Sequence, residues 1–369
     1  MKFYVVAGEA SGDARGVELL RAIRERAPGT EFVGAGGREM RDFAGDAIFD
    51  WADEAVVGLW DVLKKYGYFR KQFHRMLAEI EAAKPDALIT IDYPGFNMRL
   101  AKAAKKRMPG LRTIHYVSPQ VWAWHRGRIP KMAKFLDLML CLFPFELPLY
   151  ADAGLRAVCV GHPLLDSLAA EKREQPRDAS LVALLPGSRG KEVRKIFPIM
   201  IEAAKLLKQS RPSLRFEAAA AREALADEMR AMLAAHGCDA GFAITLRTAH
   251  DLMQRAGAGM VCSGTATLES TFFGLPMVII YKVAWLTWAV GKRLVKIPWL
   301  GLPNVLAGRE IAREFLQDAA QPAPIAGEIL RLLEDSSARE EQQRAQAAVI
   351  ASLGERGAAR RAADAILAG

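Results

Sequence analysis

Short apolar runs alternate along the chain with longer segments of helical period. In the first half, apolar-rich runs predict strands at Lys2–Ala7, Ala87–Ile91, Arg112–Val117 and Leu136–Cys141. Most of these runs are followed by segments long enough for helices of about three turns. This alternation is typical of a parallel sheet covered by helices.

The second half repeats the pattern. Four more strands are predicted, at Leu181–Leu185, Arg215–Ala219, Gly259–Val261 and Met277–Ile280. After Gly190, one helical face collects apolar side chains at spacings of three and four, namely Val193, Ile196, Met200, Ala203 and Leu207. The chain is therefore expected to be α/β, with two Rossmann-like domains built on parallel sheets.

Turn-forming and charged residues separate the two series. Gly161-His-Pro-Leu164 and the charged stretch Glu171–Asp178 indicate a hinge and a linker. The expected parts are a first domain over 1–165, a second over 166–345 and a helical tail over 346–369. From Ser336 onward the sequence predicts two amphipathic helices, which pack back on the first domain or against a partner subunit in a homodimer.

Charge narrows the class of partner only when its distribution is considered. The 369 residues carry 51 Lys and Arg against 42 Asp and Glu, a formal charge of +9. That excess fits nucleic acid, a phosphorylated metabolite or a membrane surface equally well. Residues 99–134 contain ten cations and no acid, and residues 64–75 contain five more.

Targeting and cysteine patterns indicate a cytoplasmic protein. The chain opens directly on an apolar strand pattern rather than on a signal peptide, and no apolar run reaches the ~18 residues of a membrane span. The four cysteines show no CxxC pair, so they are expected to be reduced core thiols. Any membrane contact is therefore expected to be peripheral.

The loop after the first strand, Gly8–Asp13, lies where open α/β sheets bind ligands. It lacks GxGxxG, which argues against a nicotinamide-dependent oxidoreductase. Asp13 can cap a helix over Ala14–Arg26. That role leaves Glu9, a carboxylate at the mouth of a strand, unexplained.

Two later glycine loops suit a nucleotide diphosphate. In the loop 185–192, Gly187 allows the backbone to approach a ligand, and Arg189 can pair with phosphate oxygens. A Pro-Gly turn with solvated charges is the alternative. In the loop 262–269, phosphate donors are available at Ser263, Gly264 and Thr265. Glu269 can accept bonds from a ribose diol, whereas helix capping by Ser263 or Thr265 is the competing explanation.

Asp92 is the strongest candidate for catalysis. It directly follows the apolar strand Ala87–Ile91, so its carboxylate is expected at the ligand edge of the sheet, facing a cleft between domains. Such a group can act as general base toward a sugar hydroxyl. Asp before Pro-Gly is equally a turn former.

Aromatic residues accompany the basic segments. The stretch Thr113–His125 suits an anionic amphiphile or single-stranded nucleic acid, while His115 is expected to be a hydrogen-bonded strand-end residue. Leu59, Trp60 and Leu63 precede Lys64-Lys65 and can bury in lipid, or pack as an ordinary helix. A similar mixture occurs at Trp285–Trp299.

Taken together, seven segments resemble the lipid-A-disaccharide synthase family. They are Ala7-Gly-Glu-Ala-Ser-Gly-Asp13, Ile91-Asp92 with Phe96-Asn97, His115-Tyr-Val-Ser-Pro119 with Val121-Trp-Ala-Trp124, Phe143-Pro-Phe-Glu146, Leu184-Leu-Pro-Gly-Ser-Arg-Gly190, Ser263-Gly-Thr-Ala266 and Leu302-Pro-Asn304. Each segment alone is a weak signal, but their order from residue 5 to about 310 is specific.

The resemblance implies a GT-B fold and an inverting transfer without a metal or other cofactor. UDP-2,3-diacylglucosamine would be joined to 2,3-diacylglucosamine 1-phosphate, giving a β-1′,6-linked disaccharide 1-phosphate and UDP. Asp92 would activate the acceptor's 6-hydroxyl, Glu9 would lie nearby, and Arg189 would hold the diphosphate. The resemblance also implies contacts to UDP from Ser188, Thr265, Glu269 and Asn304.

One position departs from the family pattern. Many members carry a second Asp where this chain has Gly95, so that a second catalytic carboxylate would have to be Glu9. A muramyl-intermediate glycosyltransferase and a UDP-sugar epimerase are the nearest alternatives, and the first-domain loops argue against both. A nucleic-acid-binding protein is the alternative from another class, and no nucleic acid is expected as a partner.

Overall fold

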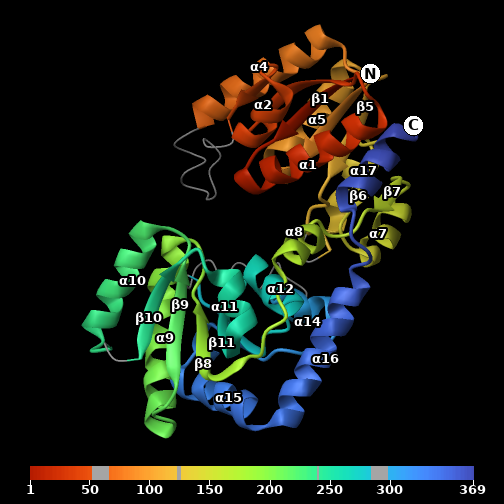
Figure 1. Ribbon diagram of the computed structural model, residues 1–369. Coiled ribbons are helices and arrows are strands. Elements are labelled where there is room, and N and C mark those ends of the chain that lie inside the picture. The colour runs from red at the N-terminus through yellow and green to blue at the C-terminus, as the bar shows by residue number, and fades with distance from the viewer. Residues whose placement is uncertain (52–65, 123–125, 239–240, 284–297) are drawn as a thin grey trace. The chain divides into compact units, whose positions relative to one another are not determined.

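The computed structural model describes residues 1–51, 66–122, 126–238, 241–283 and 298–369, and the chain divides into two compact units (Figure 1). Unit 1 contains residues 1–166 together with 355–369, and unit 2 contains residues 167–354. Each unit holds one parallel sheet covered by helices. The α/β class and the two parallel sheets predicted from the apolar pattern are confirmed.

The sheet of unit 1 has seven parallel strands in the order β3-β2-β1-β4-β5-β6-β7. The strands are β1 Lys2–Ala7, β2 Glu31–Gly36, β3 Ile48–Asp50, β4 Ala87–Ile91, β5 Arg112–Tyr116, β6 Leu138–Cys141 and β7 Ala157–Cys159. The helices are α1 Ala10–Arg26, α2 Arg38–Ala44, α4 Tyr66–Ala83, α5 Pro94–Arg107, α6 Ile129–Met132, α7 Leu147–Ala151 and α17 Ala358–Leu367. Helix α8, Leu164–Glu171, spans the division between the units. Because Ile91 pairs with both Ala7 and Tyr116, strands β1, β4 and β5 end at the same edge.

The last helix of the chain returns to unit 1. Helix α17 packs against α1, and Arg26 forms an ion pair with Asp364. The N–H groups of Gly357 and Ala358 donate to the Asp166 carboxylate at 2.8 and 3.1 Å. The prediction that C-terminal helices pack back on the first domain is therefore confirmed for α17.

The sheet of unit 2 has six parallel strands in the order β10-β9-β8-β11-β12-β13. The strands are β8 Asp178–Leu185, β9 Arg215–Ala220, β10 Phe242–Leu246, β11 Ala256–Cys262, β12 Met277–Tyr281 and β13 Glu314–Leu316. The helices are α9 Gly190–Ser210, α10 Glu223–Ala235, α11 Ala249–Arg255, α12 Thr265–Phe272, α14 Leu302–Ala307, α15 Pro322–Glu334 and α16 Ser336–Ser352. The apolar face predicted for α9 is buried in the core of this unit.

Short strands at the sides of the sheets escaped the sequence pattern. Strands β3, β7 and β13 have three residues each, and β10 is half-exposed at the edge of its sheet. Strand β2 contains two glycines, which weaken the strand signal. Periodicity therefore located the central strands, whose residues are buried on both faces, and missed the flanking ones.

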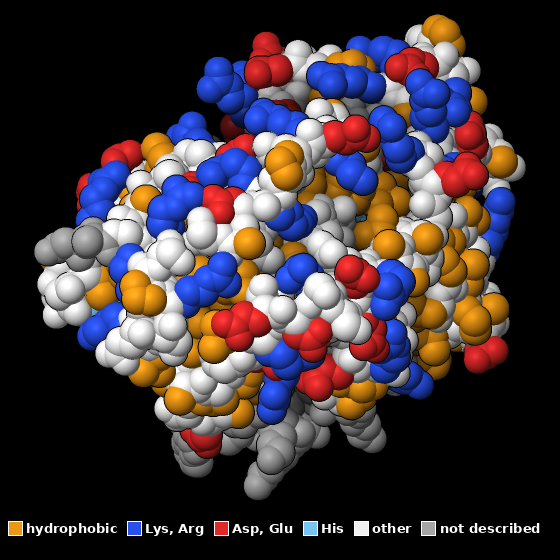
Figure 2. All heavy atoms as spheres, turned by 60° about the horizontal axis from the view of Figure 1, so that its bottom comes forward, with side chains coloured by type: hydrophobic (Ala, Val, Ile, Leu, Met, Phe, Trp, Pro, Cys, Tyr) orange, Lys and Arg blue, Asp and Glu red, His pale blue; other side chains and the backbone are white. Residues whose placement is uncertain are grey.

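On the face drawn in Figure 2, Lys and Arg side chains lie among Asp, Glu and apolar side chains. Within the described ranges, no helix is long and apolar enough to cross a bilayer. All four cysteines are free thiols.

Candidate active site

Two loops of unit 1 leave the sheet side by side. Because Ala7 pairs with Ile91, the residues that follow them, Gly8-Glu9 and Asp92-Tyr93, lie at neighbouring strand ends. A Cβ atom on Gly8 would lie only 2.5 Å from the ring of Tyr93, so no larger residue fits there. The structure thus brings the loops that carry Glu9 and Asp92 into contact.

The turn at Asp92 is strained. Asp92 and Tyr93 both adopt the left-handed backbone conformation, with φ of 50° and 45°. For residues other than glycine this costs about 1–3 kcal/mol each. Backbone N–H of Asp92 donates to the carbonyl of Tyr116 at 2.9 Å, and Asn97 Nδ2 donates to the carbonyl of Asp92 at 2.8 Å. Val117, directly after β5, has φ 74°, so strain gathers at the edge where parallel sheets bind ligands.

A cluster of aromatic side chains packs against the turn at Asp92 and Tyr93. Trp51 is fully buried, and its Nε1 donates to the carbonyl of Ala7 at 2.7 Å. Its ring centroid lies 6.2 Å from that of Tyr93 and 4.8 Å from that of Phe96. Phe69 adds an edge contact at 6.3 Å. These rings hold the strained turn in one position.

The Asp92 carboxylate is oriented and accessible. Its Oδ1 accepts the N–H of Tyr93 at 2.9 Å, and its Oδ2 pairs with Arg15 Nη1 at 2.7 Å. The Asp92 side chain is 31% exposed and that of Arg15 is 22% exposed. A carboxylate held this way can accept a proton from an incoming hydroxyl.

Other ionisable groups of unit 1 lie around Arg15. Burial raises the pKa of Glu18, and Asp166 adds to the effect. Burial, with a smaller contribution from the charge of Arg15, lowers the pKa of His162 to about 4, so this imidazole is neutral at pH 7. The hydroxyl of Tyr116 is buried without a hydrogen-bond partner among the described residues. Arg15 therefore interacts both with the accessible Asp92 carboxylate and with these more buried groups.

The role predicted for Asp13 is wrong. Helix α1 begins at Ala10 with Glu9 at the N-cap position, so Asp13 lies inside the helix. Its carboxylate accepts N–H groups from Gly37, Glu39 and Met40 at 2.7, 2.9 and 3.2 Å. Asp13 therefore caps the start of α2, a partner that local sequence does not indicate, and Glu9 is left half-buried at the loop.

In unit 2 the two glycine loops also lie side by side. Leu185 pairs with Val261, so the loops after β8 and β11 leave the same edge of the sheet. Gly187 has φ 105°, and a Cβ atom there would lie 3.4 Å from Cys262 Sγ and 2.6 Å from a Glu192 oxygen. Ser188 follows in the same loop. The sequence-predicted residues of both loops are thus neighbours.

Arg189 stands at the N-terminus of α9. Its backbone is extended at the N-cap position, and its guanidinium lies 3.3 Å from Glu192 Oε1. The side chain is 65% exposed. An exposed guanidinium beside helix N–H groups is a site that favours phosphate.

The helix that follows β11 has a glycine at its N-cap position. Gly264 occupies the N-cap of α12, and no side chain makes a capping bond there. Helix capping was the competing explanation for Ser263 and Thr265, and it therefore does not account for either residue. The N–H of Ser263 donates to the carbonyl of Ile280 at 2.9 Å, so only its hydroxyl can serve a ligand.

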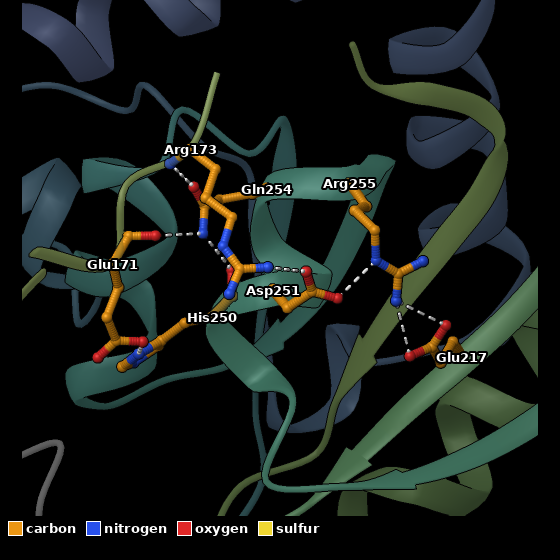
Figure 3. A network of polar contacts seen from close by, with 7 residues as sticks. All are labelled: Glu171, Arg173, Glu217, His250, Asp251, Gln254 and Arg255. Atoms are coloured by element: carbon orange, nitrogen blue, oxygen red, sulfur yellow. Dashed lines mark hydrogen bonds and ion pairs between the residues drawn. The ribbon is translucent and has the colours of Figure 1, made fainter. Parts of the chain in front are cut away.

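Glu269 is engaged by a histidine that sequence did not single out. His250 Nε2 lies 3.6 Å from Glu269 Oε2, and its Nδ1 lies 2.8 Å from Glu171 Oε2. The hydrogen bonds to Glu269 and Glu171 raise the pKa of His250 to about 9, so it is protonated at pH 7. Figure 3 shows His250 pointing to Glu171, next to a chain of pairs in which Arg255 joins Asp251 to Glu217.

Asn304 does not fit its predicted role. It is fully buried, and its Oδ1 accepts the N–H groups of Ile311 and Ala312 at 2.8 and 2.9 Å. Its Nδ2 donates to the carbonyl of Ala312 and to Glu314 at 2.7 and 2.8 Å. All four hydrogen-bonding positions of the amide are occupied, so the side chain fixes the backbone before β13 and has none left for UDP.

Sequence reasoning missed three residues at these edges. Arg15 pairs with Asp92 and His250 pairs with Glu269, and each partner is distant in the sequence. Tyr281 is the last residue of β12, and the nearby charge of Arg189 acts on the pKa of its hydroxyl. The last position could have been found, because Tyr281 follows the predicted strand Met277–Ile280. The other two depend on how helices pack.

Three further predictions from the sequence concern His115, the membrane segments and metal binding. His115 Nδ1 lies 2.8 Å from Thr90 Oγ1 and burial lowers its pKa to about 3, as for a strand-end core residue. The membrane segment with Leu59, Trp60 and Leu63, and most of Trp285–Trp299, lie outside the described residues. In the described part no three His, Cys, Asp or Glu side chains could hold a metal, and metal-free transfer stays a prediction.

Known proteins resemble the chain over its whole length. The model of a family described as lipid-A-disaccharide synthetase matches residues 3–367. The lipid-A-disaccharide synthase of Trichlorobacter lovleyi is 41% identical, with 98% of this chain and 96% of that protein covered. That of Pseudomonas aeruginosa is 39% identical, with 91% and 90% covered.

Solved structures with low identity show the fold. A putative UDP-N-acetylglucosamine 2-epimerase from Listeria monocytogenes has a TM-score of 0.65 at 13% identity, covering 100% of this chain and 96% of that one. A UGT transferase from Siraitia grosvenorii in complex with UDP has a TM-score of 0.60 at 12% identity, covering 100% and 99%. The two Rossmann-like units thus form a GT-B fold.

Proposed function

The chain belongs to the lipid-A-disaccharide synthase family, a family of glycosyltransferases in lipid A biosynthesis, and from this premise we propose its substrates and its working residues. The donor is UDP-2,3-diacylglucosamine, and the acceptor is 2,3-diacylglucosamine 1-phosphate. The products are UDP and the β-1′,6-linked disaccharide 1-phosphate. A muramyl-intermediate transferase or an epimerase is not favoured, because the family match covers residues 3–367.

The observation that carries the proposal is the Asp92 carboxylate, held in a strained turn by Arg15 and by its neighbouring backbone. Asp92 takes the proton of the acceptor's 6-hydroxyl as that oxygen attacks the anomeric carbon of the donor. The bond between this carbon and the UDP oxygen breaks, and UDP leaves with the electron pair. Attack from the side opposite UDP inverts the configuration.

The donor is held by unit 2 in this proposal. Arg189 and the helix N-termini after Gly187 and Gly264 stabilise the diphosphate and the negative charge that develops on it. Glu269, kept in place by His250, accepts the ribose hydroxyls. Glu9, beside the strained turn, helps to position the acceptor.

The acceptor carries acyl chains, so we place the reaction at the inner face of the cytoplasmic membrane. The acid-free basic stretch of residues 99–134 supports this placement, since each Lys or Arg near an anionic surface contributes about 1 kcal/mol. Only peripheral contact is proposed. The homodimer remains a prediction from the sequence.

The test is a mass-spectrometric assay with the two diacyl-sugar substrates and the Asp92→Asn variant. We expect the wild type to form the disaccharide 1-phosphate and the variant to lose about 10²–10⁴-fold in turnover, as the loss of a general base predicts. UDP affinity measured by calorimetry should stay unchanged, because Asp92 lies in unit 1.

Asp137→Asn serves as the control, because Asp137 is also an ion-paired carboxylate of unit 1, joined to Lys105 at 2.8 Å. It should leave turnover within a few-fold of wild type. Full turnover in Asp92→Asn would remove the base from the proposal. Absence of product from the wild type would reject the substrates themselves.

A further inference from the structure

A groove in unit 1 is not used by the reaction described so far. It has a volume of about 550 Å³ and lies between α5 and the segment around α6. Its lining includes Pro94, the first residue of α5 and the second residue after Asp92. One lining residue of the groove therefore lies directly beside the strained turn that holds the proposed base.

The floor of this groove is apolar. Val121, Met132 and Phe135 line it and are otherwise buried in the core of unit 1, with exposures of 3, 4 and 9%. Pro94 and Met98 complete the floor on the α5 side and are partly exposed. An apolar floor of this kind binds hydrocarbon better than it binds water or a sugar ring.

The rim of the groove is cationic. Two rows of exposed cations face each other across the floor, one on α5 and one around α6. They are Arg99, Lys102 and Lys106 in the first row and Arg128, Lys131 and Lys134 in the second. The spacing of three and four places the first row on one side of α5.

Among the described residues, these six cations have no ionic partner. Within the described part of the chain, none of the six forms an ion pair, whereas Lys105, which also lines the groove, is paired with Asp137 at 2.8 Å. Six unpaired cations around one groove repel one another, so the site gains from an anionic occupant. The occupant that satisfies both floor and rim is an anionic amphiphile.

We propose that this groove holds an acyl chain of the sugar 1-phosphate acceptor on its apolar floor, while the cationic rim binds the acceptor's phosphate. The inference rests on the proposed function, and it adds where the acceptor's lipid and charge are recognised. It assigns acceptor binding to α5 and α6, next to Asp92, and leaves donor binding to unit 2.

The first test removes one cation from each row with Lys102→Gln/Lys131→Gln. We expect the KM for the acceptor to rise about tenfold, with unchanged KM for the UDP-sugar, because each cation near an anionic group contributes substantially to binding. The matched control Arg211→Gln/Arg360→Gln also removes two cations that form no ion pair in the described residues, and it should leave both values unchanged.

Acceptors that differ in their phosphate or in their acyl chains then distinguish phosphate recognition from acyl-chain recognition. With 2,3-diacylglucosamine that lacks the 1-phosphate, the KM ratio of the double variant to wild type should fall to about one, since the partner charge is gone. Met98→Gln, which makes the floor polar at a partly exposed position, should raise the KM of a long-chain acceptor more than that of a short-chain one.

The outcomes that overturn the inference are distinct. If the wild type forms product and the double variant keeps its acceptor KM, the groove does not bind the acceptor. Loss of binding to anionic phospholipid vesicles with an unchanged acceptor KM in detergent would assign the rim to bulk lipid. Displacement of the acceptor by an oligonucleotide would assign it to nucleic acid. Absence of product from the wild type would reject the proposed function, and the groove assignment with it.

Discussion

His250 makes the donor-side geometry sensitive to pH. Its imidazole lies between two carboxylates, 2.8 Å from Glu171 and 3.6 Å from Glu269, and His250→Gln removes the charge while keeping a polar side chain. Because the pKa is raised from 6.5 to about 9 in the folded protein, the stabilisation is complete below about pH 6.5 and disappears as the pH rises through 9.

The magnitude follows from that pKa. At 1.36 kcal/mol for each factor of ten in proton affinity, the raised value corresponds to about 3 kcal/mol. The side chain is 29% exposed, and solvent screening reduces such interactions, so we expect about 1–2 kcal/mol. The variant should therefore lose this stability at pH 6.5 and almost none of it at pH 10.

Two measurements test the reasoning. Calorimetric unfolding of the full chain at pH 6.5 and 10 gives the difference between wild type and His250→Gln at each pH, and His74→Gln, which removes an exposed imidazole of α4, is the control. NMR titration of labelled histidines gives the pKa directly, assigned by the signal that the variant lacks. A midpoint below pH 7, or equal destabilisation at both pH values, would refute the charged bridge.

Three further changes probe the two edges. Arg189→Ala should weaken UDP binding by about 1–3 kcal/mol in calorimetry, through loss of charge-assisted bonds to the diphosphate; equal affinity would place the donor elsewhere. Arg15→Gln should lower turnover by about tenfold or more while UDP affinity is kept, because the Asp92 carboxylate loses its 2.7 Å partner; an unchanged rate would leave Arg15 without a positioning role. Trp51→Ala should destabilise the protein by about 3–5 kcal/mol in chemical unfolding, since it empties the support of the strained turn; a loss under 1 kcal/mol would mean that the turn is held without the ring.

The sequence predicted the parts of the fold that follow from continuous apolar runs. The strands Ala87–Ile91 and Leu181–Leu185 are buried at the centres of their sheets, so their residues carry a strong signal. Since parallel strands point their carboxyl ends to one edge, the loops with Asp92, Gly187 and Ser263 followed from the same pattern. Three-residue strands such as β3 and β13 have no such pattern.

Long-range contacts account for what the sequence did not reveal. Arg15 is 77 positions from Asp92, and it reaches that carboxylate only because α1 lies near the end of β4. Asp13 looked like a local cap and instead caps a helix 24 or more residues onward. Asn304 looked like a ligand contact, but its amide bonds to residues 7 to 10 positions away. A short motif shows which functional groups are present. The packing of the helices and strands determines which residue each group bonds to.

Because α17 covers α1, the amino-terminal unit is completed only by a helix that is synthesised after the whole of unit 2. On the ribosome, residues 1–166 emerge with one helix of their own fold missing, and all of unit 2 must follow before that helix arrives. A nonsense codon just before residue 355 would spare unit 2 and leave α1 with an uncovered face.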